Sequence, residues 1–215
     1  VAVPRELPSG SATEISLPDF YSDSDKMRIF GKEITLELKA ALIGKKILLS
    51  RATRYQLDTG SIPIQLFREL CSKAGREDLL NKPKQLRYSI SRTAIPSKII
   101  LSRDMGRFVG CLMGDGHVSG NCLNLSACIP ELREDFKRLS KVLFNLDASM
   151  YKTSVRVHSK ALVRVMNDVF GVTKSSATKH VSETVFSANR EFVSGFLSGL
   201  FDTDGSVSWK KPEIE

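Results

Sequence analysis

The sequence contains few cysteines, few aromatic residues and no long apolar run. Its four cysteines (Cys71, Cys111, Cys122 and Cys128) form no CxxC pair, which argues against a zinc knuckle or a disulfide scaffold. We expect them to be reduced in apolar surroundings, which suits a cytoplasmic protein. No apolar run approaches the roughly 18 residues that a membrane-spanning helix needs. No signal-peptide pattern follows Val1, so neither a membrane protein nor a secreted one is expected.

The composition that remains is that of a globular protein with an excess of positive charge. The 215 residues are 41% apolar and 26% charged, enough to bury a core in one large domain or two small ones. Residues 1–107 hold 19 basic and 12 acidic side chains, a net charge of +7, whereas residues 108–215 hold 13 and 12, a net charge of +1. The excess is densest over residues 82–107. It indicates a polyanionic partner, although a solvated surface explains it about equally well.

Three helices are predicted in the basic half. Apolar residues recur on one helical face between Lys32 and Ile43, Ser50 is a plausible N-cap for a short helix, and Pro63 suits the first turn of a third. Helices in this order and of these lengths are typical of a helix-turn-helix unit. The short second helix carries groups that reach base edges and phosphates, namely Arg51, Thr53, Arg54, Tyr55 and Gln56. An ordinary three-helix bundle with a polar outer face remains the alternative.

The second half alternates helices and strands. Residues 123–127 alternate with period 2, and residues 150–158 are typical of a strand or hairpin with Arg156 and His158 on its outer face. Helices are expected over residues 104–113, from Pro130, over 160–169 and over 191–202. The helix from Pro130 has a predicted inner face of Leu132, Phe136, Leu139, Val142 and Leu143. A polar loop is expected over 171–180, and a linker before Ser24, preceded by the end of a strand at Val1–Val3.

Two segments of nine residues resemble each other. They are FVGCLMGDG at 108–116 and LSGLFDTDG at 197–205, offset by 89 residues. Both place small residues four apart, at Gly110 and Gly114 and at Gly199 and Thr203, so each presents a smooth stripe on one helical face. Two such helices can pack closely, which would bring Asp115 and Asp204 together at their C-terminal ends.

The two acids would repel each other unless a cation lay between them. Each would stand beside a helix C-terminus, which carries partial negative charge. Gly116 and Gly205 are expected to be C′ residues that turn the chain away. Oxygen ligands of this kind suit Mg²⁺, and Mg²⁺ held by paired acids suits phosphodiester cleavage. The alternative is that each Asp-Gly pair is only a turn after a helix. A single copy would favour that interpretation, but two copies with matched small residues do not.

These motifs resemble those of the LAGLIDADG homing endonucleases. LSGLFDTDG is a close match, and FVGCLMGDG is looser, with Met113 where the family often has an acid. Residues 160–163, the loop at Lys174–Ser176 and the opening VAVPRELP are similar to the intein-encoded, archaeal-type branch, in which a helix-turn-helix insertion also occurs. The resemblance covers nearly the whole chain and is strongest over 104–207.

The resemblance implies an α+β fold, in which a helical module precedes a half-domain of αββαββα order. It divides the chain into a splicing-domain remnant and linker (1–30), a helix-turn-helix module (31–100), a first half-domain (101–190) and the start of a second (191–215). Too few residues follow Gly205 to complete that second half, so we expect a fragment of a longer, pseudo-symmetric monomer.

The resemblance also implies roles for particular residues. Asp115 and Asp204 would be the catalytic acids that bind Mg²⁺, joined by the main-chain carbonyls of Gly114 and Thr203. The family uses a lysine upstream of the second motif, for which Lys179 is the first choice and Lys174 the second. Lys152 and Arg156, with His158 beside them, would contact double-stranded DNA from the sheet.

The function implied is site-specific, Mg²⁺-dependent cleavage of double-stranded DNA by an endonuclease encoded in an intein. We expect this fragment to bind DNA weakly and to cleave poorly by itself. A DNA-binding regulator with the same fold, or an intein whose endonuclease has decayed, remains open as an alternative, and the looser first motif leaves room for decay.

Overall fold

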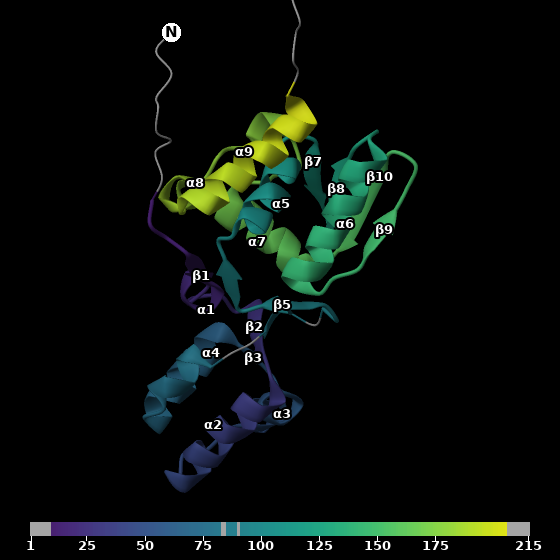
Figure 1. The fold of residues 1–215 in the computed structure, drawn as a ribbon. Helices are drawn as coiled ribbons and strands as arrows, with labels where there is room; N and C mark the ends of the chain where they lie inside the picture. The colour runs from purple at the N-terminus through teal and green to yellow at the C-terminus, as the bar shows by residue number, and fades with distance from the viewer. Residues whose placement is uncertain (1–9, 83–84, 90, 206–215) are drawn as a thin grey trace, which may run out of the picture.

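The protein divides into an N-terminal module and a C-terminal body. In Figure 1 the module is the lower part and the body is the upper part. The structure is a computed structural model and describes residues 10–82, 85–89 and 91–205. The fold is mixed α+β with antiparallel sheets, which confirms the predicted class. Within the described residues, no helix combines the length and the apolar character needed to cross a bilayer.

The segment before the module is structured rather than a linker. Strand β1 (Glu14–Ser16) pairs antiparallel with β6 (Lys98–Ile100), and the short helix α1 (Leu17–Phe20) buries Leu17 completely. The predicted linker is therefore wrong from Glu14 onward, because apolar side chains there enter the common core. The strand end expected at Val1–Val3 lies outside the described residues.

The module contains the three predicted helices together with an unpredicted sheet. The helices are α2 (Lys32–Gly44), α3 (Arg51–Thr59) and α4 (Ile64–Ala74), followed by the 3-10 helix η1 (Glu77–Asn81). The sheet has the order β3-β2-β4-β5 and is built from β2 (Met27–Phe30), β3 (Ser61–Pro63), β4 (Gln85–Tyr88) and β5 (Ala94–Pro96). A purely helical module is thus wrong. Its strands have only three or four residues, too few to show a period of 2.

Local signals fix the ends of the module's helices. The hydroxyl of Ser50 accepts a hydrogen bond from the backbone N–H of Thr53 at 3.1 Å and so caps α3. Gly60 and Gly75 follow α3 and α4 with φ of 73° and 62°, a left-handed conformation that favours glycine. The helix boundaries were predictable because each depends on residues within one turn.

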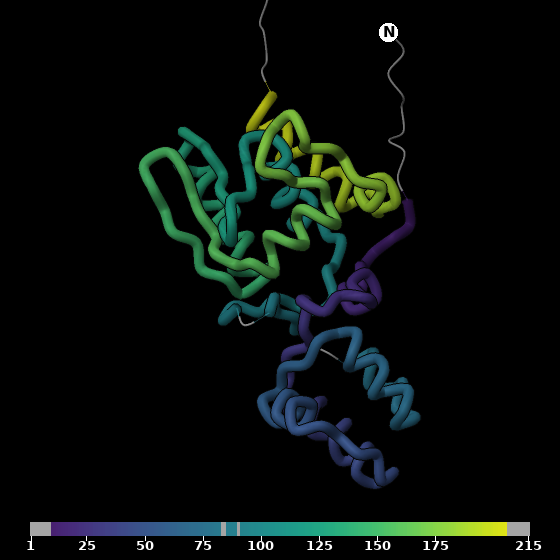
Figure 2. Tube along the Cα trace, turned by 180° about the vertical axis from the view of Figure 1, so that it is seen from behind, coloured from purple at the N-terminus to yellow at the C-terminus, as the bar shows by residue number. Residues whose placement is uncertain are grey.

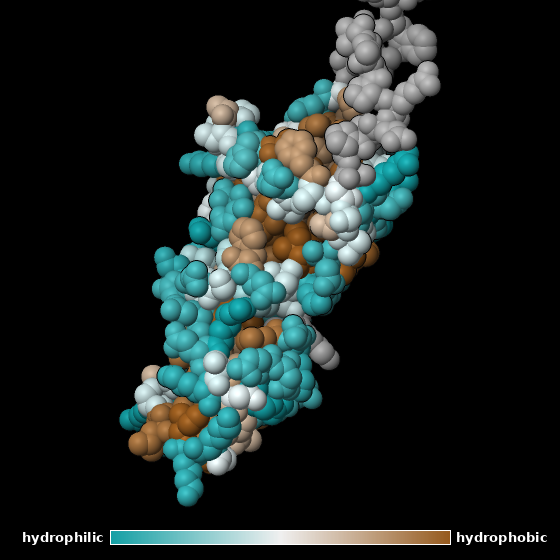
Figure 3. Space-filling model, turned by 90° about the vertical axis from the view of Figure 1, so that its left-hand side faces the viewer, coloured by the Kyte–Doolittle hydropathy of each residue, from teal (hydrophilic) through white to brown (hydrophobic). Residues whose placement is uncertain are grey.

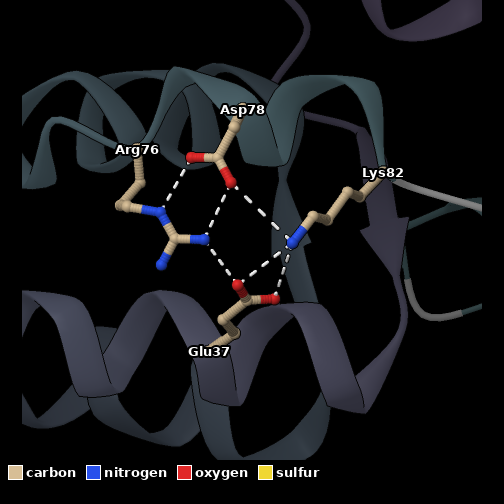
Figure 4. A network of polar contacts seen from close by, with 4 residues as sticks. All are labelled: Glu37, Arg76, Asp78 and Lys82. Atoms are coloured by element: carbon tan, nitrogen blue, oxygen red, sulfur yellow. Dashed lines mark hydrogen bonds and ion pairs between the residues drawn. The ribbon is translucent and has the colours of Figure 1, made fainter.

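An ionic network joins the segment around η1 to α2 within the module (Figure 4). The Arg76 guanidinium contacts both Glu37 on α2 and Asp78, the latter through Nε to Oδ1 at 2.7 Å, and Lys82 donates to Glu37 at 3.1 Å. These cations lower the pKa of Asp78 to about 2, chiefly through the hydrogen bond from Arg76. The network faces solvent, so we regard it as a surface clamp between helices.

The module also exposes apolar side chains at its far end. Ile43 and Leu48, at the end of α2 and in the loop that follows, are 59% and 93% exposed. Figure 3 shows hydrophobic atoms gathered at the lower tip of a mainly hydrophilic face. The loop that leads into α3 therefore presents apolar groups beside the basic side chains of Lys45 and Lys46.

The C-terminal body follows the predicted αββαββα order. Its elements are α5 (Arg103–Met113), β7 (Gly116–Ser119), β8 (Cys122–Ser126), α6 (Pro130–Phe144), β9 (Ala148–Met150), β10 (Ser154–His158) and α7 (Lys160–Phe170). The four strands form one antiparallel sheet in the order β7-β8-β10-β9. The 3-10 helix η2 (Ser176–Thr178) and helix α8 (Glu183–Ser187), neither of them predicted, lead to the long helix α9 (Arg190–Asp204).

The sheet turns one face to the helices and the other to solvent. Leu123, Leu125, Val155 and Val157 are completely buried under the helices, and in the same core the ring of Phe108 on α5 stacks on another Phe of α6 with centroids 4.4 Å apart. Arg156 and His158 lie on the outer face, as predicted. A period of 2 is what places these two sets on opposite faces.

Two burial predictions are wrong. Val142 is 65% exposed, because at about 100° per residue it falls at the edge of the apolar stripe of α6 rather than at its centre. Cys128 is exposed, whereas the other three cysteines are buried as expected. It lies in the loop that leads into α6, where no element covers it.

Candidate active site

Helices α5 and α9 pack backbone to backbone through glycines. A Cβ placed on Gly110 would lie 2.1 Å from the carbonyl oxygen of Phe196, and one on Gly199 would lie 2.3 Å from that of Arg107. Real side chains do not approach so closely, so glycine is required at both positions. The same holds one turn earlier for Gly106 and Gly195, each about 2.0 Å from a carbonyl oxygen of the facing helix. Sequence reasoning missed this last pair, although it continues the same spacing of four.

The contact extends to the C-terminal ends of both helices. A Cβ on Gly114 would lie 2.0 Å from Oγ1 of Thr203 and 3.4 Å from Cγ of Asp204. The four packing residues that the repeat predicted therefore lie at the contact. Because the helices approach most closely along this line, the residues that end them are held beside each other.

The glycines that follow the two motifs do not turn the chain as predicted. Gly205 has φ of −71° and ψ of 140°, extended backbone angles that any residue adopts, and glycine is needed there only because a Cβ would lie 2.3 Å from the carbonyl oxygen of Phe201. Gly116 begins strand β7, and its Cβ would lie 2.5 Å from the Cα of Leu112. The expected C′ role is wrong for both. Gly116 is needed instead because the strand folds back directly over the end of α5.

Asp115 and Asp204 are brought together at this end of the helix pair. Asp115 follows Gly114, the C-cap of α5, and Asp204 is the last residue of α9. Partial burial raises the pKa of Asp115, and the charge of Asp204 raises it further, while Lys179 opposes the shift. The two carboxylates therefore interact electrostatically, as the repeat predicted.

Lys179 supplies a positive charge to the same place. Its Nζ donates to the main-chain oxygens of Met113 at 2.9 Å and Gly114 at 2.6 Å, so the side chain caps the C-terminal end of α5. Burial lowers the pKa of Lys179, although both aspartates act in the opposite direction. Lys174, the second choice, is exposed and lies beside Tyr88 and Lys160 instead. The structure thus selects Lys179 as the lysine that reaches the acids.

The donors available here fit Mg²⁺ better than zinc. Among residues 10–82, 85–89 and 91–205 no three His, Cys, Asp or Glu side chains form a metal-binding group. The site has two carboxylates and the carbonyl oxygen of Gly114, which has a second lone pair free beside its bond from Lys179. Mg²⁺ binds oxygen and keeps several waters, so one or two carboxylates are sufficient for it. The charge repulsion at Asp115 is the feature that a cation would relieve.

A groove of about 540 Å³ leads from Asp115 across the outer face of the sheet. Arg156 lines it, and its guanidinium is fixed by a hydrogen bond to Asn124 Oδ1 at 3.0 Å and by stacking 4.6 Å from the ring centroid of Tyr151. Lys152 is exposed in the turn before β10. Of the basic residues predicted for DNA contact in this body, Arg156 therefore lines the same groove as Asp115, whereas Lys152 is only shown to be exposed.

The end of the chain is similar to a known family of domains. Residues 191–215 match the family described as the LAGLIDADG-like domain. The match includes the second motif and almost all of α9, and it supports the homing endonuclease family as the one that this chain resembles.

Several curated proteins are similar over about half of the chain. The DNA-directed RNA polymerase subunit Rpo1C of Methanocaldococcus jannaschii is 32% identical over 127 residues, which are 55% of this chain and 14% of that protein. A DNA polymerase of Thermococcus hydrothermalis is 29% identical over 154 residues (62% and 9%). The glutamine–fructose-6-phosphate aminotransferase of M. jannaschii is 25% identical over 118 residues (52% and 11%). The chain thus spans a small part of the length of each relative.

The short helix of the module offers fewer base-reading groups than expected. Arg51, Arg54 and Tyr55 on α3 are exposed, but Gln56 is only partly exposed, and its buried Oε1 has no hydrogen-bond partner among the residues that the structure describes. At 100° per residue Gln56 turns toward the buried Leu57 side of α3. Gln56 is therefore poorly placed to read bases, whereas the other three face solvent.

A salt-bridge cluster at the site was not predicted. Arg107 on α5 contacts Asp202 Oδ2 on α9 and Asp135 Oδ2 on α6, both at 2.6 Å, and donates to the hydroxyl of Ser198 at 2.8 Å. It joins three helices next to the last turn of α9. Its partners are far apart in the sequence, so no local pattern pointed to them. Asp202, within the second motif, is thereby engaged in packing rather than directed at Asp115.

Proposed function

We propose that this chain is part of a metal-dependent DNA endonuclease of the homing type. The observation that carries the proposal is the placement of Asp115 and Asp204 at the joined ends of two helices that glycines hold in contact. A purely structural helix pair has no need to place two repelling carboxylates at its closest point. A divalent cation bound by both carboxylates would offset their repulsion and so explain the arrangement.

We further propose that the segment is an insertion of the intein type. Its relatives carry the names of an RNA polymerase subunit, DNA polymerases and an aminotransferase, and the aminotransferase shares no activity with the polymerases. The similar segment makes up only 6–14% of each of them. A mobile element inserted into different host proteins explains this distribution better than an activity that the hosts share.

In the proposed reaction the residues of this chain bind the metal ion, neutralise negative charge on the phosphate and orient the attacking water. Asp115 and Asp204, with the carbonyls of Gly114 and Thr203, would hold Mg²⁺, which supplies charge neutralisation and a polarised phosphodiester oxygen. Lys179 adds a positive charge beside the acids, suited to stabilising negative charge on the phosphate or to orienting a water. Its lowered pKa leaves a larger fraction of Lys179 as the neutral amine, the form that can accept a proton, than in an exposed lysine at the same pH.

We propose that two surfaces of the protein recognise double-stranded DNA. Arg156 and Lys152 on the sheet would follow the groove that leads from Asp115, and Arg51, Arg54 and Tyr55 on α3 would act as a helix-turn-helix reader. The complete protein is proposed to be a pseudo-symmetric monomer in which each acid serves one strand.

Nicking, by the complete protein, of a pool of supercoiled plasmids with randomised inserts tests the proposal, since this chain alone is expected to cleave poorly. We expect nicked circles with Mg²⁺ and none with a chelator, and Lys179→Met should slow nicking about 10²-fold. The matched control is Lys137→Met, which removes an exposed lysine from the outer side of α6. DNA binding without any metal-dependent nicking would favour the non-catalytic regulator or the decayed endonuclease instead.

A further inference from the structure

A hollow of about 520 Å³ lies at the joint between the module and the C-terminal body. Figure 1 shows β5 between the two parts at this joint, and Figure 2 shows the same region from behind. The hollow is lined by Lys26, Tyr88, Ser89, Ser91, Asn121 and Lys160. Two ammonium groups, two serine hydroxyls and an amide can all donate hydrogen bonds, and no acidic side chain is among these lining residues. Such a lining suits an anion.

Lys160 is held in place without being neutralised. Its Nζ lies 4.6 Å from the centroid of the Tyr88 ring, a cation–π contact that fixes the side chain and leaves its charge intact. A hydrogen bond from Thr93 Oγ1 to Ser159 Oγ at 3.2 Å braces the same joint. Within the described part of the chain, neither Lys26 nor Lys160 has a carboxylate partner in an ion pair.

The hollow lies at the opposite end of strand β7 from the acids. The strand begins at Gly116, next to Asp115, and the turn after it contains Asn121, which lines the hollow. At about 3.3 Å per residue the strand and its turn cover roughly 15–20 Å. Consecutive phosphates along one DNA strand are about 3.4 Å apart in rise, so this span corresponds to about five nucleotides. The two parts share the hollow, since Tyr88 and Ser89 belong to the module and Asn121 and Lys160 to the C-terminal body.

We propose that this hollow binds backbone phosphate of the DNA, about five nucleotides from the cleaved bond, and so ties the recognition module to the catalytic end. The inference rests on the proposed function, since it assumes that duplex DNA lies along the outer face of the sheet. The role is positioning and carries no base information, because phosphates are the same at every sequence. It explains why basic residues lie at the joint, outside both recognition surfaces.

The salt dependence of DNA binding tests the inference, with a synthetic duplex of random sequence as the probe. Each phosphate contact contributes about 0.9 to the slope of log affinity against log salt. We expect Lys26→Gln and Lys160→Gln to lower the slope by about 0.9 each and the double variant by about 1.8. Lys160→Arg, which keeps the charge and the stacking on Tyr88, should retain the wild-type slope. Lys137→Gln on α6 is the control and should leave the slope unchanged.

The possible results separate this inference from the function on which it rests. If the wild-type chain does not bind the duplex, the proposed function itself fails. If it binds but the double variant keeps the full slope, the hollow does not hold phosphate and only this inference fails. An effect of Lys160→Gln with none of Lys26→Gln would also overturn it, because the lysine would then act only by bracing the joint. Thermal melting of each variant checks that it is folded.

Discussion

Asp115→Asn and Asp204→Asn are each expected to reduce Mg²⁺-dependent nicking by about 10²–10³-fold. The two carboxylates lie at the joined ends of the helix pair, where the positive charge of a cation would be held between them, whereas the neighbouring Asp202 is paired with Arg107. The loss of a preorganised charge contact at a reaction centre typically has an effect of this size. The measurement is the initial rate of nicked-circle formation at saturating enzyme.

A matched variant distinguishes this effect from a general change in charge. Asp147→Asn removes one negative charge from the same body at an exposed position where the carboxylate pairs with Lys141. It should nick at the wild-type rate. If the two motif variants also kept the wild-type rate, neither aspartate would have the proposed role.

Gly110→Ala is expected to destabilise the protein by about 2–3 kcal/mol. Its Cβ would lie 2.1 Å from the carbonyl oxygen of Phe196, so α5 and α9 would have to move apart. A backbone overlap this close is expected to cost about 3–4 kcal/mol, at or above the top of the usual range for overpacking, and the gain of about 1 kcal/mol from replacing glycine in a helix reduces the net loss to about 2–3 kcal/mol. Urea unfolding monitored by circular dichroism measures the change.

Gly44→Ala is the control for this substitution. Gly44 is the last residue of α2, and a Cβ there meets no atom within 4 Å. This variant should be as stable as the wild type or slightly more stable. Equal stability of the Gly110 and Gly44 variants would show that the two motif helices are not in backbone contact.

The features that the sequence predicted best were those with local or repeated signals. Ser50 and Gly60 fixed the bounds of α3, since caps depend on residues within one turn. The spacing of Gly110 and Gly199 predicted the helix contact, because small residues four apart leave a smooth stripe on any helix. The same repeat paired Asp115 with Asp204 across 89 positions, which no local pattern could have done.

The features that escaped prediction depend on distant partners or very short elements. The strands of the module are too short to show alternation, and Arg107 finds its three acceptors on two other helices. The choice between Lys174 and Lys179 required the path of the loop that precedes α8. Gly116 was misjudged because its need for glycine comes from Leu112 beneath it and not from its backbone angles.

Titration with Mn²⁺ shows most directly whether Asp115 and Asp204 share one cation. Mn²⁺ accepts the same oxygen ligands as Mg²⁺, and its free concentration can be followed by electron paramagnetic resonance without DNA. Binding should tighten as the pH rises through the raised pKa of Asp115, because the proton competes with the metal for that carboxylate. The wild-type chain is expected to bind one ion that both Asp115→Asn and Asp204→Asn lose, and binding that survives both substitutions would contradict a shared metal site.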